Sequence, residues 1–244
     1  MTEHQKIMDR INELHFLPVA VPLFDSLPDV VFFVKDRKAR YVAVNKTLVR
    51  RCGVDAKEEL IGKTALEVFP TPMGRRYYEE DQQVLTEGAS LLDVLELHLY
   101  AQGGSGWCIT TKLPLKDESG TVIGIVGISN DVHAPEAQHS GYRELAEAVR
   151  HIQGHFEETL RLDSLANLCG LSVYQFEQRM KKVFQLTAGQ FINKTRIDAA
   201  CRMLKSGESP IADIALACGF SDQSAFTRQF KATAGLTPTE YRRS

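Results

Sequence analysis

The sequence predicts two domains: an α+β domain with a five-stranded antiparallel sheet and helices, then an all-α domain with two helix-turn-helix units. Five β-rich runs separated by turns occupy the first half, and helical patterns follow a polar break at Pro135. The helical half also contains an internal repeat. We expect an N-terminal helix over 1–21, the α+β domain over 22–133, a linker over 134–142 and the helical domain over 143–244.

The composition is that of an ordinary soluble globular protein, with 43% hydrophobic and 25% charged residues. There is no run of about eighteen apolar residues and no basic-then-apolar start, so we expect a cytoplasmic protein without a membrane segment. The net charge of -2 conceals an asymmetry. Residues 1–133 carry 15 Lys/Arg and 19 Asp/Glu, whereas residues 161–244 carry 12 and 7. The basic C-terminal region is therefore the expected site of phosphate contact.

The cysteines are widely scattered and include no Cys-x-x-Cys pair: Cys52, Cys108, Cys169, Cys201 and Cys218. Their spacing does not match that of zinc ligands, so we expect reduced thiols and no metal.

The first expected element is a helix over about residues 3–17, whose apolar side chains recur at steps of three and four. Such a stripe needs a partner, which is either the domain that follows or a second copy of the chain. Next, β-rich runs at 30–34 and 41–44 flank a charged turn, which predicts a β-hairpin.

A helix is then expected over 75–86, ending at Gly88. Three more strands are expected, at 95–100, 107–115 and 122–129. In the middle strand an apolar series alternates with a more polar one, which predicts one buried face. The apolar series is Trp107, Ile109, Thr111, Leu113 and Leu115, and the other is Cys108, Thr110 and Lys112.

The repeat in the helical half matches residues 165–172 with residues 214–221, at a spacing of 49 residues. After one extra residue in the second copy, the match continues as far as Phe191 and Tyr241. In each copy an Ala precedes a Gly by four residues. The Ala lets two helices cross closely and the Gly permits a left-handed turn, so each copy predicts a helix-turn-helix. Good N-cap residues, Ser172 and Ser221, are expected to begin the second helices.

One such helix pair is explained equally well by simple packing, but two basic copies favour DNA binding. A connecting helix is expected over about 188–205. With about 17 residues it is roughly 25 Å long, which suits two reading helices one DNA turn, ~34 Å, apart.

Residues 143–244 resemble the AraC-type family of transcription regulators. The resemblance is carried by residues 211–220, by Phe226, Arg228, Phe230 and Lys231, and by the closing Gly235-Leu236-Thr237-Pro238-x-x-Tyr241-Arg242. It implies a double helix-turn-helix in which side chains of both second helices contact bases. Those positions are Tyr174, Glu177 and Gln178 in the first unit, and Gln223, Ser224, Thr227 and Arg228 in the second.

The chemistry of these side chains suits base recognition, since Gln pairs well with adenine and Arg with guanine or phosphate. Glu177 has two readings: it accepts a hydrogen bond from cytosine, or it caps a helix or faces solvent. The first unit departs from the family pattern at Gln185, where Gly is usual, and at Ala188, where Pro is usual. We therefore expect a less sharply turned end to the first unit.

Residues 22–133 resemble a PAS domain, through Leu27-Pro28-Asp29, Lys35-Asp36, Asn45, Ile61-Gly62-Lys63, Trp107 and the segment 120–132. This implies a five-stranded antiparallel sheet with flanking helices, often with a cavity for a small molecule, and it places Asp131 near the joint that passes a signal onward. No histidine lies between His15 and His98, and His98 is expected to be an ordinary surface or sheet residue. We expect no cofactor, and either an apolar pocket for an organic effector or a purely dimerising domain.

The expected function is sequence-specific DNA binding by a transcription regulator that is not an enzyme, with the PAS domain modulating promoter binding. The expected partners are double-stranded promoter DNA, a small organic effector, a second copy of the chain and RNA polymerase, but no membrane. Three alternatives stay open. They are a constitutive DNA binder whose PAS domain only dimerises, a DNA-repair alkyl acceptor, which needs an activated cysteine, and an adaptor whose basic helices bind protein.

Overall fold

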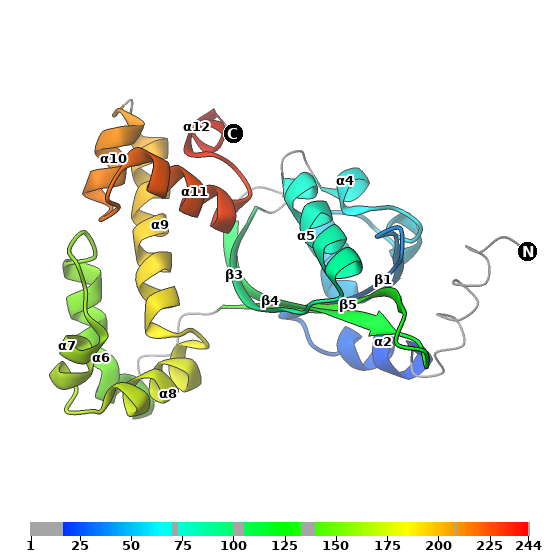
Figure 1. Cartoon of the computed structure of the whole chain (residues 1–244), viewed down its shortest axis with the longest axis horizontal. Helices are drawn as coiled ribbons and strands as arrows, with labels where there is room; N and C mark the ends of the chain where they lie inside the picture. The colour runs from blue at the N-terminus through cyan, green and yellow to red at the C-terminus, as the bar shows by residue number, and fades with distance from the viewer. Residues whose placement is uncertain (1–16, 70–72, 100–104, 133–139, 208, 244) are drawn as a thin grey trace, which may run out of the picture. The chain divides into compact units, whose positions relative to one another are not determined.

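The chain forms two compact units, Met1–Asp131 and Val132–Ser244, which are described separately (Figure 1). This computed structural model describes residues 17–69, 73–99, 105–132, 140–207 and 209–243. The helix expected over residues 3–17 and most of the expected linker therefore lie outside the described residues. No helix within the described ranges is long and apolar enough to cross a membrane.

The N-terminal unit is built on the predicted five-stranded antiparallel sheet, in the order β2-β1-β5-β4-β3. The strands are β1 (Val30–Asp36), β2 (Tyr41–Val44), β3 (Leu91–Leu99), β4 (Ser105–Lys116) and β5 (Val122–Asp131). The predicted hairpin is formed by β1 and β2. All five strands lie where the sequence predicts them, but β3 begins at Leu91 rather than Leu95.

Helices cover both faces of this sheet (Figure 1). One face carries α3 (Lys46–Cys52), a 3-10 turn (Lys57–Glu59), α4 (Ala65–Val68) and α5 (Met73–Glu87). The other face is covered by α2 (Leu17–Asp25), which continues through Pro22 beyond the helix end expected at residue 21. Because both faces are covered, β1 is buried along almost its whole length.

The face of β4 that looks toward α5 is polar, which the sequence pattern did not lead us to expect. Cys108, Thr110 and Lys112 are only 1%, 4% and 3% exposed. Trp107 and Ile109 of the apolar series are buried as predicted, whereas Leu113 is 41% exposed. Lys112 is buried because it forms ion pairs with Glu80 and Asp81 of α5. The interior of this unit is thus partly ionic.

The C-terminal unit is all helical and contains both predicted helix-turn-helix units. Its helices are α6 (Ser140–Gly154), α7 (Leu162–Leu168), α8 (Val173–Phe184), α9 (Ala188–Ser206), α10 (Ile211–Ala217), α11 (Gln223–Ala234) and α12 (Pro238–Arg243). The first helix-turn-helix is α7–α8 and the second is α10–α11, and the predicted connecting helix α9 joins them (Figure 1).

The two turns share a left-handed glycine, Gly170 at φ +65° and Gly219 at φ +77°. Ser172 caps α8 as predicted, accepting a 3.2 Å hydrogen bond from the backbone N–H of Gln175. The cap expected at Ser221 is wrong, because Asp222 caps α11 with a 2.7 Å bond from Ala225. The extra residue of the second copy lies just before α11, and a carboxylate there also suits the helix dipole.

The first unit ends as sharply as the second, contrary to expectation. Gln185 adopts a left-handed φ of +59° after α8, and its N–H bonds to Lys181 at 3.0 Å. Gly235 has φ +74° at the matching position, where its N–H bonds to Lys231 at 2.9 Å. A side chain at such a φ costs roughly 1 kcal/mol or more, so the first unit bears this strain while keeping the same turn.

We predict that Gln185→Gly raises the free energy of unfolding of the C-terminal unit by about 1 kcal/mol, because glycine adopts the left-handed turn without a Cβ clash. Urea unfolding followed by far-ultraviolet circular dichroism measures this change. Gly235→Gln is the matched control and is expected to lower stability. An unchanged or lower stability of Gln185→Gly contradicts the prediction.

Candidate nucleic-acid interface and internal cavity

The helices α8 and α11 each bury one face and expose the other. Phe176 and Met180 of α8, like Phe226 and Phe230 of α11, are fully buried. On the outer faces the structure exposes most of the predicted base-contacting side chains. The exposed ones are Tyr174, at 73%, Gln178, Gln223, Ser224 and Arg228, and Thr227 is half-buried.

The predicted contacts form two separate groups rather than one cluster. Tyr174 and Gln178 lie one turn apart on the outer face of α8. On α11, four side chains share one face through their spacing along the helix, and these are Gln223, Ser224, Thr227 and Arg228. The helices bearing the two groups lie toward opposite ends of α9 (Figure 1).

Glu177 stands apart from the other predicted contacts. It is half-buried, and its carboxylate accepts a 3.2 Å hydrogen bond from the backbone N–H of Ala188 at the start of α9. A carboxylate at this position is favoured by the helix dipole. Of the two readings that the sequence left open, this contact favours helix capping.

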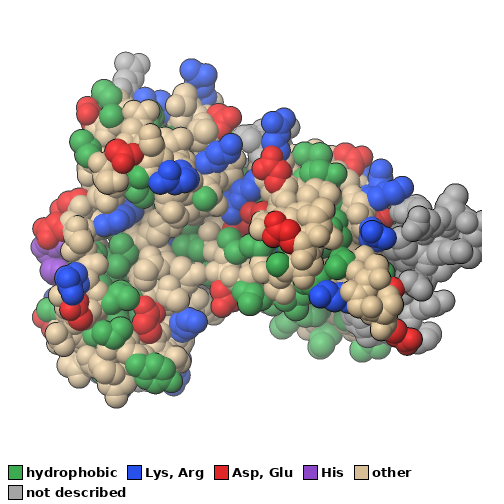
Figure 2. Space-filling model, viewed as in Figure 1, with side chains coloured by type: hydrophobic (Ala, Val, Ile, Leu, Met, Phe, Trp, Pro, Cys, Tyr) green, Lys and Arg blue, Asp and Glu red, His purple; other side chains and the backbone are tan. Residues whose placement is uncertain are grey.

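Further basic side chains flank the two faces. Lys181 and Lys231 are exposed one turn beyond Glu177 and Thr227, at matching positions of the repeat. Arg179, by contrast, forms a 3.0 Å ion pair with Glu144 of α6. Figure 2 shows Lys and Arg side chains exposed among the helices of the C-terminal unit. The shared Lys position was visible in the repeat, and it extends the basic surface beyond the predicted residues.

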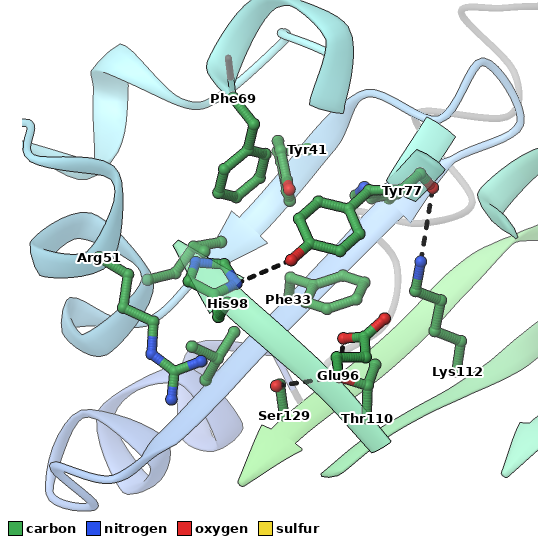
Figure 3. Close-up of a pocket in the computed structure, with 13 residues that line it drawn as sticks. Phe33, Tyr41, Arg51, Phe69, Tyr77, Glu96, His98, Thr110, Lys112 and Ser129 are labelled. Atoms are coloured by element: carbon green, nitrogen blue, oxygen red, sulfur yellow. Dashed lines mark hydrogen bonds between the residues drawn. The ribbon is translucent and has the colours of Figure 1, made fainter. Parts of the chain in front are cut away.

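The N-terminal unit encloses a cavity of about 40 Å3 between the sheet, α3 and α5 (Figure 3). Aromatic, aliphatic and polar side chains line it together: Val31, Phe33, Lys35, Tyr41, Leu48, Arg51, Phe69, Tyr77, Glu96, His98, Thr110, Lys112 and Ser129. The surface of this cavity is mostly apolar, as expected, but charged and polar side chains line it as well. Sequence reasoning missed these polar residues, although the every-second-residue spacing of Glu96 with His98 and of Thr110 with Lys112 was a usable signal.

Two hydrogen-bonded groups form part of the polar lining (Figure 3). The Tyr77 hydroxyl and His98 Nδ1 are 2.8 Å apart. The Thr110 hydroxyl lies 2.5 Å from Glu96 Oε2 and 3.0 Å from the Ser129 hydroxyl. Burial, aided by the charges of Arg51 and Arg76, lowers the pKa of His98 to about 3, so the imidazole is neutral. Of the two positions expected for His98, surface or sheet, the structure shows the sheet: the side chain lies on β3, is 6% exposed and lines the cavity.

Buried ion pairs surround the cavity. Asp81 of α5 pairs with Lys35 of β1 and, at 2.9 Å, with Lys112 of β4. Glu80 pairs with Lys112 at 2.9 Å and with Arg76 at 2.8 Å. Burial raises the pKa of Asp81, but Lys112 and Lys35 outweigh this and lower it overall.

Two further pairs complete this ion network. Arg76 reaches Glu96 at 3.0 Å, and Arg51 of α3 pairs with Asp131, the last residue of β5. The pKa of Glu96 is raised by burial and by the charge of Glu80, against the opposing effect of Arg76. Within the described part of this unit, no group of His, Cys, Asp and Glu side chains has the arrangement of a metal site.

Comparison with known proteins assigns the two units separately. A helix-turn-helix domain family model matches residues 165–244, and a PAS fold model matches residues 24–137. The probable transcription factor PqrA of Proteus vulgaris is 35% identical over 85 residues, which are 35% of this chain and 70% of that protein.

A second relative is covered to a smaller share of its length. The probable transcriptional regulator LumQ of Photobacterium leiognathi is 29% identical over 91 residues, so the match spans 37% of this chain and 37% of that protein. A crystal structure of a transcriptional regulator with an AraC-type DNA-binding domain, from Chromobacterium violaceum, is 30% identical with a TM-score of 0.40. It covers 41% of this chain and 90% of that one. With its double helix-turn-helix and the PAS fold that precedes it, this chain belongs to the AraC-type family of transcription regulators.

Proposed function

We propose that the chain is a sequence-specific regulator whose helices α8 and α11 read successive major grooves of promoter DNA. The observation that carries this proposal is the pair of exposed polar faces, each backed by a buried apolar face, on helices joined by α9. The 19 residues of α9 make a helix of about 28 Å, which with its flanking helices suits one DNA turn of ~34 Å.

The two reading helices differ in chemistry. Arg228 and Gln223 of α11 offer the groups that bond to guanine and adenine edges. On α8, Tyr174 and Gln178 supply an aromatic contact surface and one amide, so α11 is expected to contribute more of the sequence readout.

The N-terminal unit is proposed to bind a small uncharged organic molecule in its cavity, and this binding is proposed to modulate promoter binding. Four basic and four acidic side chains balance one another among the described residues around the cavity, in the pairs given above. A charged guest would leave one buried charge without compensation, which costs several kcal/mol. Dimerisation of this domain and a contact with RNA polymerase stay predictions.

The alkyl-acceptor enzyme is disfavoured by the state of four of the five thiols. Burial raises the pKa of Cys52 and Cys108 to about 12, and that of Cys201 and Cys218 to about 11. A reactive thiol needs a lowered pKa and exposure, and these four have neither.

We predict that Arg228→Ala weakens binding to a selected DNA site about 10- to 100-fold, because a bidentate base contact is lost. Fluorescence anisotropy with labelled duplex measures the affinity. Arg37→Ala, an exposed arginine of the N-terminal unit, is the control for loss of one positive charge. Equal affinities of Arg228→Ala and the wild type would remove Arg228 from the interface.

Glu177→Gln tests whether that side chain reads a base or only caps α9. The amide oxygen still accepts the N–H of Ala188, while the charge that repels phosphate is removed. We expect affinity for specific and unrelated duplexes to rise together, by about threefold at low salt. A selective loss of affinity for the specific site would instead show that Glu177 reads a base.

Ser129→Leu is expected to fill the cavity and to abolish binding of any small molecule that copurifies with the chain. Native mass spectrometry of the full-length chain measures the bound mass, and Ser119→Leu in an exposed turn is the control. Retention of the molecule by a folded Ser129→Leu protein would place its site elsewhere. A wild-type chain that carries no molecule, and that no metabolite in a panel stabilises, would favour the purely dimerising alternative.

A further inference from the structure

The helix α9 connects the two helix-turn-helix units, and a second contact between the two halves of the domain lies outside it. The loop that joins α6 to α7 leads directly into the first unit, and its backbone lies against the turn of the second unit. A Cβ atom built on Gly219 would lie 2.7 Å from the carbonyl oxygen of Phe156 and 2.8 Å from that of Glu157. Only a glycine permits so close an approach.

Arg196 holds the same loop from the middle of α9. Its Nε donates to the Phe156 carbonyl and its terminal nitrogen donates to the Glu158 carbonyl, each at 2.8 Å. The guanidinium also lies 5.9 Å from the ring centre of Phe220, the residue after Gly219. One side chain thus contacts the loop that leads into the first unit and the turn of the second.

The matching glycine of the first unit shows that this contact is not a general need of the turn. Gly170 has a similar φ of +65°, but a Cβ atom built there would meet nothing within 4 Å. The left-handed turn therefore explains Gly170 fully, whereas Gly219 is also required by the neighbouring backbone. The asymmetry points to a role for Gly219 beyond forming its own turn.

We propose that Arg196, Gly219 and the 156–158 backbone form a joint that fixes the spacing and rotation between α8 and α11, and so sets the distance between half-sites that the chain accepts. Without the joint, α9 alone would link the two units, and bending or fraying at its ends would let each unit turn independently. With the joint, two connections define one geometry. Arg196 is a positioning residue in this account, and the inference rests on the proposed DNA binding by both helices.

The test begins with selection of a two-part site from random-sequence DNA by the wild-type full-length chain. Affinity is then measured for that site and for versions with base pairs inserted, one at a time, between the two parts. An insertion of about two base pairs turns the second part by about 70°, so we expect the wild type to lose at least ~10-fold in affinity.

Arg196→Met keeps the aliphatic stem but removes both hydrogen bonds, and Gly219→Ala introduces the backbone clash. When about two base pairs are inserted, both variants are expected to lose less than about threefold in affinity, because the two units can adjust separately. Gly170→Ala is the matched control, since it bears the same left-handed strain without the clash. Its affinity is expected to depend on half-site spacing as that of the wild type does. Arg196→Lys is expected to show an affinity loss between those of the wild type and Arg196→Met. A lysine ammonium lacks the planar geometry with which the guanidinium donates to two carbonyls at once.

Circular dichroism establishes that each variant is folded, and Arg196→Lys takes the place of any variant that is not. Wild-type spacing dependence in the folded Arg196 and Gly219 variants overturns the proposal, as does a wild type that tolerates the insertion. A selection that recovers one half-site alone overturns the two-groove reading itself, and recovery of no DNA overturns the proposed function. These outcomes are therefore distinguishable.

Discussion

The burial of α9 between two helix-turn-helix units is the interaction on which the C-terminal unit depends. Its apolar side chains contribute to both halves: Phe191 contacts Phe184 of α8, while Leu204 and Ala200 are buried toward the other end. Neither short helix pair buries enough apolar surface to be stable alone, so each needs this shared helix. The helix that connects the two units is thus also the core that holds both of them folded.

The N-terminal unit combines an apolar core with a network of buried ion pairs. Asp81 bridges Lys35 and Lys112, and through them α5 is tied to two different strands. Buried ion pairs contribute little net stability, but removing one partner is costly because the other charge is left uncompensated. The pairs made by Glu80 and Asp81 therefore disfavour any arrangement of α5 that would leave Lys35 or Lys112 without its partner. The cavity lies between the strands and the helix that these ion pairs join.

Much of the fold was predictable from the sequence, because strand alternation and the repeat both reflect simple burial. The errors have physical reasons. The polar interior of β4 escaped prediction because an alternating pattern is normally read with its apolar face inward, and Lys112 reverses that rule through its partners on α5. The cap of α11 was missed because an inserted residue shifted it to Asp222. The joint at Gly219 depends on tertiary contact, which no local pattern encodes.

The central claim is that one chain reads two successive major grooves. Methylation interference with a selected duplex tests it directly, since methyl groups on guanine N7 block contacts from the major groove. The account predicts two clusters of interfering guanines on one face of the DNA, about 10 base pairs apart. A single cluster, or interference confined to the minor groove, would contradict it.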